Sequence, residues 1–252
     1  MLFVCRGITK RYNGEAVVGD VALEIPQGGF VSLLGPSGVG KTTLFNVLSG
    51  VDRPDAGQVL LNNEDITGIS GKVSYMLQKD LLLEFRTVLD NVILPLLLAG
   101  EKKQEARQYA ASFFPHFGLV GCEHKYPRQL SGGMRQRAAL LRTCMLRTGP
   151  NGPQNTVILL DEPFSALDAI TRLKMRDWYQ GIAGEMKLST LFITHDVEEA
   201  VTLSDRVYIM NGKPGRITAA IDILPARPRS KDFALSPEFA RFKGEIMGAI
   251  GL

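Results

Sequence analysis

The stretch Gly35-Pro-Ser-Gly-Val-Gly-Lys-Thr42 decides the fold of this chain. Before it lies FVSLLG (30–35), a short apolar run bounded by glycines, which predicts a buried strand. After it lies KTTLFNVLSG (41–50), whose apolar residues recur at helical spacing. A glycine-rich loop between a strand and a helix is the context of a phosphate-binding loop. Its glycines let successive backbone N–H groups point at phosphate oxygens, and the helix N-terminus adds partial positive charge.

The lysine and the threonines at the end of this loop suggest the ligand. We expect Lys41 to reach the β- and γ-phosphates of ATP and the Thr42 hydroxyl to ligate Mg²⁺. The alternative is a glycine-rich turn that binds nothing, which the flanking strand and helix disfavour. The residues that we predict to bind ATP through this loop are Gly35, Pro36, Ser37, Gly38, Val39, Gly40, Lys41, Thr42 and Thr43.

A second acidic motif, VILLDEP (157–163), is the natural partner of the loop. Asp161 stands at the carboxyl end of an apolar strand, where α/β sheets place their ligand groups, and would hold Mg²⁺. Glu162 follows directly and is predicted to act as the base that polarises the attacking water. Read alone, the motif could be an acidic turn at a strand end.

The rest of the chain predicts an α/β architecture. The apolar runs STLFITHD (189–196) and DRVYIMNG (205–212) read as further strands, and helical stretches such as 166–186 separate them. This alternation predicts a largely parallel sheet covered on both faces. Residues from about 87 to 147 are helical in pattern and interrupt the core. In the tail, PARPRS (225–230) is irregular by composition and 236–250 predicts an amphipathic helix.

The composition of the chain excludes several classes of protein. The 252 residues are 45% hydrophobic and 22% charged, which is ordinary for a globular protein. A net charge of +3 is too small to argue for nucleic acid or an anionic membrane. Three scattered cysteines form no disulfide framework, which favours a reducing cytosol. The most apolar run, 92–99, falls far below the roughly 20 residues that span a bilayer.

One further motif, LSGGMRQR (130–137), narrows the interpretation. Ser131 is a good helix N-cap, and Gly132 and Gly133 leave the first turn bare, so this is a second helix start suited to an anion. The alternative is a capped helix that binds nothing. With the motifs above, this segment resembles the signature of the ABC (ATP-binding cassette) ATPases. The segments DLLLEFRTVLDNV, NGKPGRI and SPEFARFKGEI resemble the importer ATPases for nitrate, sulfonate, taurine and pyrimidine-type vitamin precursors within that family.

The resemblance implies roles for residues that spacing alone would not single out. Tyr12 would stack on adenine, although packing alone could explain a Tyr before a turn. Gln78 would sense Mg²⁺ and the attacking water, and His195 would sense the γ-phosphate. The loop 165–168 would communicate across a dimer interface. The resemblance thus gives Glu162, His195 and Gln78 as catalytic residues, Thr42, Gln78 and Asp161 as Mg²⁺ ligands, and Ser131, Gly132 and Gly133 as contacts to ATP bound by a second subunit.

The resemblance also implies a fold and a set of partners. It implies a single ABC ATPase domain over 1–252 with a P-loop NTPase (RecA-like) core. That core, together with an antiparallel β-subdomain, covers about 1–78 and 150–224, an inserted α-helical subdomain covers about 79–149, and a C-terminal tail covers 225–252. Such a chain hydrolyses ATP to power import of a small solute, at the cytoplasmic face of the cell (inner) membrane as a peripheral subunit. Expected partners are transmembrane permease subunits, a second ATP-binding subunit and a solute-binding protein, with no nucleic acid.

Other functions share this cassette and stay open as alternatives. An exporter or cell-division ATPase has the same fold. A DNA-repair or translation ATPase is less consistent, because its relatives split the cassette with a coiled coil or carry two cassettes and basic arms. His116, Cys122 and His124 could be read as a metal site, but their spacing fits no standard zinc pattern.

Two surface features complete the expectations. The basic tail residues Arg227, Arg229 and Lys231 are predicted to form a solvated turn, with contact to lipid headgroups as the alternative. The loop at 148–156, with two prolines, is predicted to bulge at the surface without disturbing the site.

Overall fold

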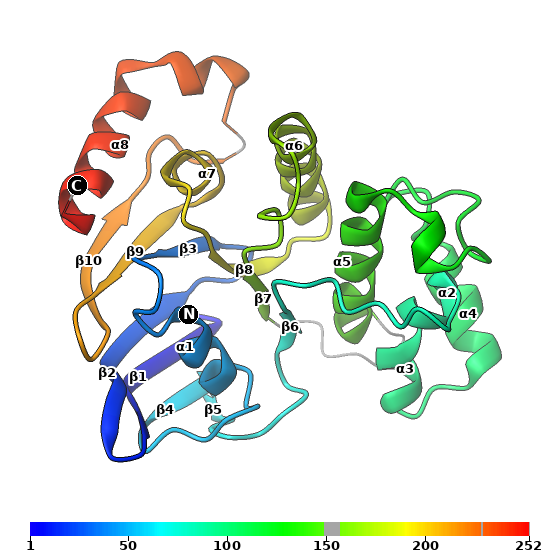
Figure 1. The fold of residues 1–252 in the computed structure, drawn as a ribbon, viewed down its shortest axis with the longest axis horizontal. Helices are drawn as coiled ribbons and strands as arrows, with labels where there is room; N and C mark the ends of the chain where they lie inside the picture. The colour runs from blue at the N-terminus through cyan, green and yellow to red at the C-terminus, as the bar shows by residue number, and fades with distance from the viewer. Residues whose placement is uncertain (149–156, 228, 252) are drawn as a thin grey trace.

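A six-stranded sheet occupies the centre of the computed structural model, which describes residues 1–148, 157–227 and 229–251 (Figure 1). Its strand order is β10-β9-β3-β8-β7-β6, and all neighbours are parallel except β9 and β10. The strands are β3 (Phe30–Leu34), β6 (Ser74–Met76), β7 (Val157–Asp161), β8 (Ser189–Ile193), β9 (Arg206–Asn211) and β10 (Arg216–Asp222).

The central strands are covered on both faces. Every residue of β3, β7 and β8 is buried. Because side chains alternate along a strand, Val31 and Leu33 enter one core, whereas Phe30 enters another on the opposite face. The predicted parallel sheet with two covered faces is therefore confirmed.

A second, antiparallel sheet covers one of those faces. Its order is β2-β1-β4-β5, and it shares a core with β3, β7, β8 and the helix α1 (Lys41–Leu48). Its strands are β1 (Phe3–Tyr12), β2 (Glu15–Ile25), β4 (Ala56–Leu61) and β5 (Glu64–Asp65). This sheet confirms the antiparallel β-structure of the predicted fold class.

The helical insertion follows β6 and forms a group at the right of Figure 1. It holds α2 (Val88–Val92), α3 (Leu94–Leu98), α4 (Lys103–Ala111), the 3₁₀ turn η1 (Pro127–Gln129) and α5 (Gly132–Thr148). One core joins these helices to the second face of the sheet and to α6 (Ala169–Glu185). The predicted inserted helices are confirmed, whereas residues 149–156 of the predicted surface loop lie outside the described residues.

The C-terminal part packs at the opposite side of the molecule (Figure 1). After β8 come α7 (Val197–Leu203), β9, β10, the 3₁₀ turn η2 (Lys231–Leu235) and α8 (Pro237–Ile250). The predicted amphipathic helix is confirmed, because α8 buries Phe239, Phe242 and Ile246. Strand β10 was not predicted. It is an edge strand that pairs only with β9, and most of its residues are at least partly exposed, so it lacks the apolar run of an inner strand.

The prediction of a solvated basic turn in the tail is wrong for two of its residues. The Arg227 side chain is only 14% exposed and pairs with Asp205. Arg229 is partly buried and donates to backbone carbonyls. No local pattern in the sequence indicates these contacts, because the partners of the two arginines lie up to 28 residues away along the chain. Within the described ranges, no helix has the length and apolar character needed to cross a bilayer.

Candidate active site

The predicted site residues gather at one edge of the parallel sheet. The loop 35–40 follows β3, Gln78 follows β6, Asp161 ends β7, and His195 follows β8. Parallel strands end at the same edge, so residues far apart in sequence are brought together there. The fold therefore assembles the site from four separate strand ends.

The phosphate loop, residues 35–42, is held by close backbone packing. A Cβ at Gly35 would collide with the carbonyl oxygen of Met210 at the end of β9. Gly40 has φ of 107°, in the region that side-chain-bearing residues avoid, and immediately precedes α1. The first glycine is thus required by a neighbouring strand and the last by the turn into the helix.

Lys41 is enclosed by this loop. Its ammonium group donates to the carbonyl oxygens of Gly35 at 2.7 Å and Pro36 at 3.0 Å, and the residue is only 8% exposed. Burial lowers the pKa of Lys41, while the nearby charges of Glu162 and Asp161 oppose that shift. An enclosed cation with two acidic neighbours at a helix N-terminus is suited to the phosphates of a nucleotide.

The carboxylate of Asp161 is hydrogen-bonded to the phosphate loop. Its carboxylate accepts from the Thr42 hydroxyl at 3.0 Å and from the Tyr75 hydroxyl at 3.4 Å. Burial raises the pKa of Asp161, the hydrogen bond from Thr42 opposes this, and the charge of Glu162 raises it further. A buried carboxylate beside a hydroxyl offers the oxygen ligands that Mg²⁺ prefers, and a cation there would stabilise the ionised carboxylate. The donor set therefore fits Mg²⁺.

Glu162 forms the centre of a three-residue cluster. Its carboxylate accepts from Gln78 Nε2 at 3.1 Å and lies 3.3 Å from His195 Nδ1. Its backbone has φ of 45°, and its amide donates to the carbonyl oxygen of Ile193 in the adjacent strand. A left-handed turn at a non-glycine residue costs free energy and is often found at functional sites. The structure thus brings together Gln78, Glu162 and His195.

This cluster opens into a groove of about 840 Å³. The Glu162 side chain is 19% exposed, whereas that of His195 is 58% exposed. The carboxylate therefore lies deeper in the groove than the imidazole, but it is still accessible to a water molecule. The groove is lined by Gln78, Lys79, Asp80, Leu81, Leu82, Arg135, Gln136, Glu162, Ser165, Ala166 and His195.

The two residues adjacent to His195 in the sequence, Thr194 and Asp196, are held by hydrogen bonds to α7. The Thr194 hydroxyl donates to the buried Glu199 carboxylate at 2.6 Å. The Asp196 side chain caps α7 by accepting from the amides of Glu198 and Glu199. The sequence analysis did not identify these supports; their signal was an Asp immediately before a helix with Glu two and three residues later.

The signature segment, residues 131–133, starts α5 at a different place. The Ser131 hydroxyl accepts from the Met134 amide at 3.4 Å, and Ser131 and Gly132 are exposed. A cavity of about 420 Å³ adjoins them, bounded by residues 166–168 and the start of α6. A Cβ at Gly133 would lie 3.3 Å from Thr171 Cγ2, so close helix packing also favours glycine there.

The structure does not bring this segment to the phosphate loop. Within the described part of the chain, no hydrogen bond or ion pair joins residues 35–43 to residues 131–133. The two glycine-containing helix starts are separate features of one chain.

An ion-pair tether nevertheless links the signature helix to the Gln78 loop. Arg135, in the first turn of α5, makes two bonds to the Asp80 carboxylate at 2.9 and 3.1 Å and one to Glu84 at 2.7 Å. Arg142, two turns further on, donates to the carbonyl oxygens of Asp80 and Leu81. The sequence analysis missed this tether, because its ends are 51 or more residues apart.

Tyr12 is held beside the end of α1. Its hydroxyl donates to Asp52 at 2.5 Å, and the Lys10 ammonium lies 5.1 Å from the centre of its ring. The hydrogen bond to the Asp52 carboxylate is the main reason that the pKa of Tyr12 rises to about 12. The ring is partly exposed, so the hydroxyl is anchored while ring surface remains for another planar group.

Of the residues of the metal-site alternative, His116 and His124 are exposed. Cys122 is buried, and the His116 ring lies 6.5 Å from that of Phe113. Among the described residues, no group of three His, Cys, Asp or Glu side chains is arranged to hold a metal ion.

Comparison with known protein families gives a match over residues 18–165, to the model described as "ABC transporter". Among curated proteins, the formylaminopyrimidine import ATP-binding protein ThiZ of Halalkalibacterium halodurans is 42% identical, over 80% of this chain and 76% of that protein. The aliphatic sulfonates import ATP-binding protein SsuB 1 of Rhodococcus jostii is 41% identical, over 97% of this chain and 91% of that protein.

A solved structure gives a further match. The dimeric, post-hydrolysis structure of the ATP-binding cassette MJ0796, bound to ADP and Pi, superposes with a TM-score of 0.73 at 28% identity. The match covers 89% of this chain and all of that one.

Proposed function

Because the chain belongs to the ABC transporter family, we propose that it is the ATP-binding subunit that hydrolyses ATP to power import of a small solute across a membrane. The observation that carries the proposal is the cluster of Gln78, Glu162 and His195 beside an enclosed Lys41. The import ATP-binding proteins ThiZ and SsuB 1 favour a formylaminopyrimidine or an aliphatic sulfonate as the solute. Both lie within the nitrate, sulfonate, taurine and vitamin-precursor class that the sequence resemblance implies.

In this proposal the phosphate loop binds the nucleotide. Lys41 exchanges its two carbonyl partners for the β- and γ-phosphates, and the amides of the loop donate to phosphate oxygens. Mg²⁺ held by Thr42, Asp161 and Gln78 would offset phosphate charge. Tyr12 stacks its partly exposed ring on adenine.

Glu162 acts as the general base. Its carboxylate orients a water molecule for attack on the γ-phosphorus and accepts a proton from it. Gln78 and His195 each contact one carboxylate oxygen of Glu162, so they hold that carboxylate in position. His195 is also exposed enough to contact the γ-phosphate directly.

We further propose that one chain supplies half of each active site. The signature segment, residues 131–133, offers a helix N-terminus whose first two residues, Ser131 and Gly132, are exposed. Placed over the phosphate loop of a second ATP-binding subunit, it would close the site from water. The dimeric MJ0796 cassette supports this arrangement. The partner subunit is a second copy or a related chain.

The groove beside Gln78 is the proposed contact with the transmembrane permease. The segment that follows Gln78 exposes Leu81 and Phe85, the latter to 76%. Such apolar side chains at the mouth of a groove are typical of a protein contact. The subunit would thus lie peripherally at the cytoplasmic face of the inner membrane, with a solute-binding protein in the complex and no nucleic acid. In this scheme, about 79–149 is the helical subdomain, about 1–78 and 150–224 the core with its β-subdomain, and 225–252 a tail.

The test is to purify the chain with the permease encoded beside it and to reconstitute both in vesicles. ATP turnover should rise when the solute-binding protein loaded with its solute is added outside, and labelled solute should accumulate inside. Turnover stimulated by DNA or ribosomes, or solute movement outward, would overturn the proposal in favour of the alternative classes.

A further inference from the structure

The C-terminal tail packs against α7, the helix that follows His195. We infer that Arg229 is a positioning residue for ATP hydrolysis, which caps α7 and thereby fixes the loop that carries His195. The tail strap is defined here as residues 223–227 and 229–250. This inference rests on the role proposed above for His195.

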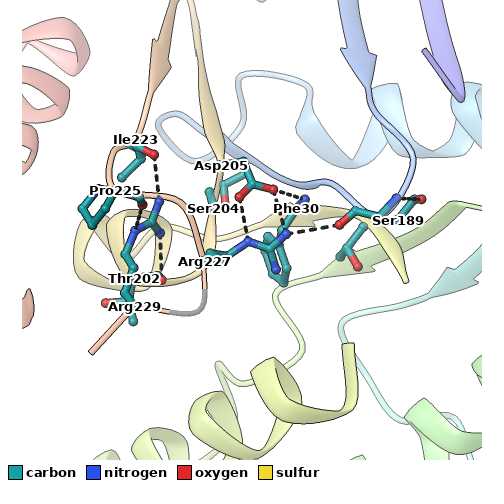
Figure 2. Close-up of polar contacts among 12 residues, drawn as sticks. Phe30, Ser189, Thr202, Ser204, Asp205, Ile223, Pro225, Arg227 and Arg229 are labelled. Atoms are coloured by element: carbon teal, nitrogen blue, oxygen red, sulfur yellow. Dashed lines mark hydrogen bonds and ion pairs between the residues drawn. The ribbon is translucent and has the colours of Figure 1, made fainter. Parts of the chain in front are cut away.

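The guanidinium of Arg229 donates to four backbone carbonyl oxygens (Figure 2), and its central carbon lies 5.3 Å from the centre of the Phe233 ring. Nη1 donates to Val201 and Thr202 at 3.0 Å each, Nη2 donates to Ile223 at 2.8 Å, and Nε donates to Pro225 at 2.8 Å. Burial is the main reason that the pKa of Arg229 falls to about 10, so the group is still a cation at neutral pH. Two of its four hydrogen bonds therefore reach carbonyls at the end of α7, and the nearby charge of Asp205 stabilises the cation.

Helix α7 needs such a partner. It has seven residues, about 10 Å of helix, and the last carbonyls of any helix lack intrahelical donors. A cation at the C-terminus also complements the helix dipole. Val201 and Thr202 are near the end of α7, so Arg229 satisfies carbonyls that the helix itself leaves unpaired.

The strap holds the start of α7 as well. The Lys243 ammonium of α8 lies 2.6 Å from the Glu198 carboxylate in the first turn of α7. Between the two ends, Phe239 and Phe242 of α8 share a core with Ala200 and Val201. Both ends and the middle of α7 are thus fixed by the strap.

The position of α7 reaches His195 through its two sequence neighbours. Thr194 and Asp196 are hydrogen-bonded to residues 198 and 199 in the first turn of α7. A shift of α7 would therefore carry the residues on both sides of His195 with it. Because Glu162 lies only 3.3 Å from His195 Nδ1, a small shift would alter that contact.

Arg227 offers a matched comparison on the same strap. It binds the Asp205 carboxylate at 2.7 and 2.8 Å and the carbonyl oxygen of Gly28 at 3.2 Å, and it lies over the Phe30 ring (Figure 2). These partners lie at the amino ends of β3 and β9, the edge opposite to the site. Arg227 should therefore support stability without acting on the His195 loop.

The experiment uses the full chain with Arg229→Gln, Arg227→Gln and, as a surface control at an exposed position on α8, Glu245→Gln. We expect Arg229→Gln to speed amide hydrogen exchange of residues 194–204 about tenfold. In the permease complex it should lower kcat about tenfold while the KM for ATP stays within about twofold. Arg229→Lys should restore part of both. Arg227→Gln should lower the melting temperature and leave kcat unchanged, and Glu245→Gln should match the wild type.

Combining the substitution with His195→Ala completes the test. Arg229→Gln should lower kcat little further in that background, because the residue to be positioned is gone. An equal loss in both backgrounds, or unchanged exchange at 194–204, would overturn the inference. If His195→Ala alone keeps wild-type turnover, then the proposed role of His195 fails and the positioning role of Arg229 fails with it. Unchanged exchange overturns only the inference about Arg229.

Discussion

The phosphate loop and the signature segment are both glycine-containing helix starts, but the chain surrounds them differently. Around the loop, Lys41 is enclosed and Thr42 is bonded to a buried Asp161. Around the signature segment, Ser131 and Gly132 face solvent and an open cavity. One helix start is therefore equipped with the cation and carboxylates that chemistry on a phosphate requires, and the other offers only backbone donors and a hydroxyl.

This difference indicates that the two segments have different roles in the site. A preorganised catalytic group must be held by its own chain, because it has to be in place before the phosphate arrives. A surface that closes over a bound nucleotide must instead stay open until the partner docks. Substitutions in the two segments and in the tether beside them should separate these roles, with effects that decrease from the catalytic carboxylate to the tether.

Replacing Glu162 by Gln should separate ATP binding from ATP hydrolysis at the phosphate loop. The amide keeps the size and the contact to Gln78 but cannot accept a proton, so turnover should fall by ~10²–10³. ATP affinity, measured by equilibrium binding of a labelled nucleotide, should change little. Glu64→Gln, at an exposed position in β5, is the matched control. Unchanged turnover in the Glu162 variant would refute its role as base.

Mixing two inactive variants should show whether the halves belong to different subunits. Lys41→Ala removes the phosphate cation, and Ser131→Arg blocks the open helix start, so each alone should lose about 10² in ATPase rate. If both cassettes of the complex are copies of this chain, equal mixing gives dimers in which one site carries both defects and the other carries neither. Activity should then recover to about a quarter of the wild-type rate. A mixture as inactive as its components would place both halves in one chain's site.

Gly132→Ala tests whether the bare helix start serves packing or a ligand. A Cβ there would lie 3.6 Å from Leu167, an ordinary contact, so folding should tolerate it and the melting temperature should hold or rise. ATPase activity should nevertheless fall about tenfold, because the methyl group crowds the face that approaches the partner's phosphate. Gly133→Ala, which meets Thr171 at 3.3 Å, should lose stability as well. Full activity in the Gly132 variant would assign this glycine to helix capping alone.

Asp80→Asn tests the tether that joins the signature helix to the loop after Gln78, and its effect should be the smallest. Burial raises the pKa of the Asp80 carboxyl, but the hydrogen bond and charge of Arg135 lower it more, so the net pKa is below its ordinary value. A lowered folded-state pKa stabilises the protein above the unfolded pKa of about 3.9, and this contribution is lost as pH falls through the folded value.

The expected cost at pH 7 is about 1 kcal/mol in the free energy of unfolding, after allowing for partial solvent exposure. Urea unfolding of the wild type and the variant should show this difference above about pH 5 and a shrinking difference below about pH 4. A difference that stays constant with pH would mean that the carboxylate charge is not what holds Arg135.

Much of the fold and site could be predicted because the decisive signals are local. The phosphate loop needs only glycines, a lysine and a threonine between a strand and a helix, and Asp161 and Glu162 directly follow an apolar run. Tyr75 and Asp80 gave no such signal, because the partners of these two side chains are brought near only by the fold. Arg229 was misjudged for the same reason, since basic residues in a proline-containing turn are usually solvated.

The sequence by itself determined the kinds of group at the phosphate edge, the alternation of strands and helices, and the helix start at Ser131. These follow from residue spacing and backbone preferences within short segments. Only the tertiary structure decided that Gln78 and His195 contact the same carboxylate and that the signature segment stands apart from the phosphate loop. It also decided that the tail arginines turn inward. Such contacts depend on which strand ends and helix ends meet, and no short stretch of sequence contains that information.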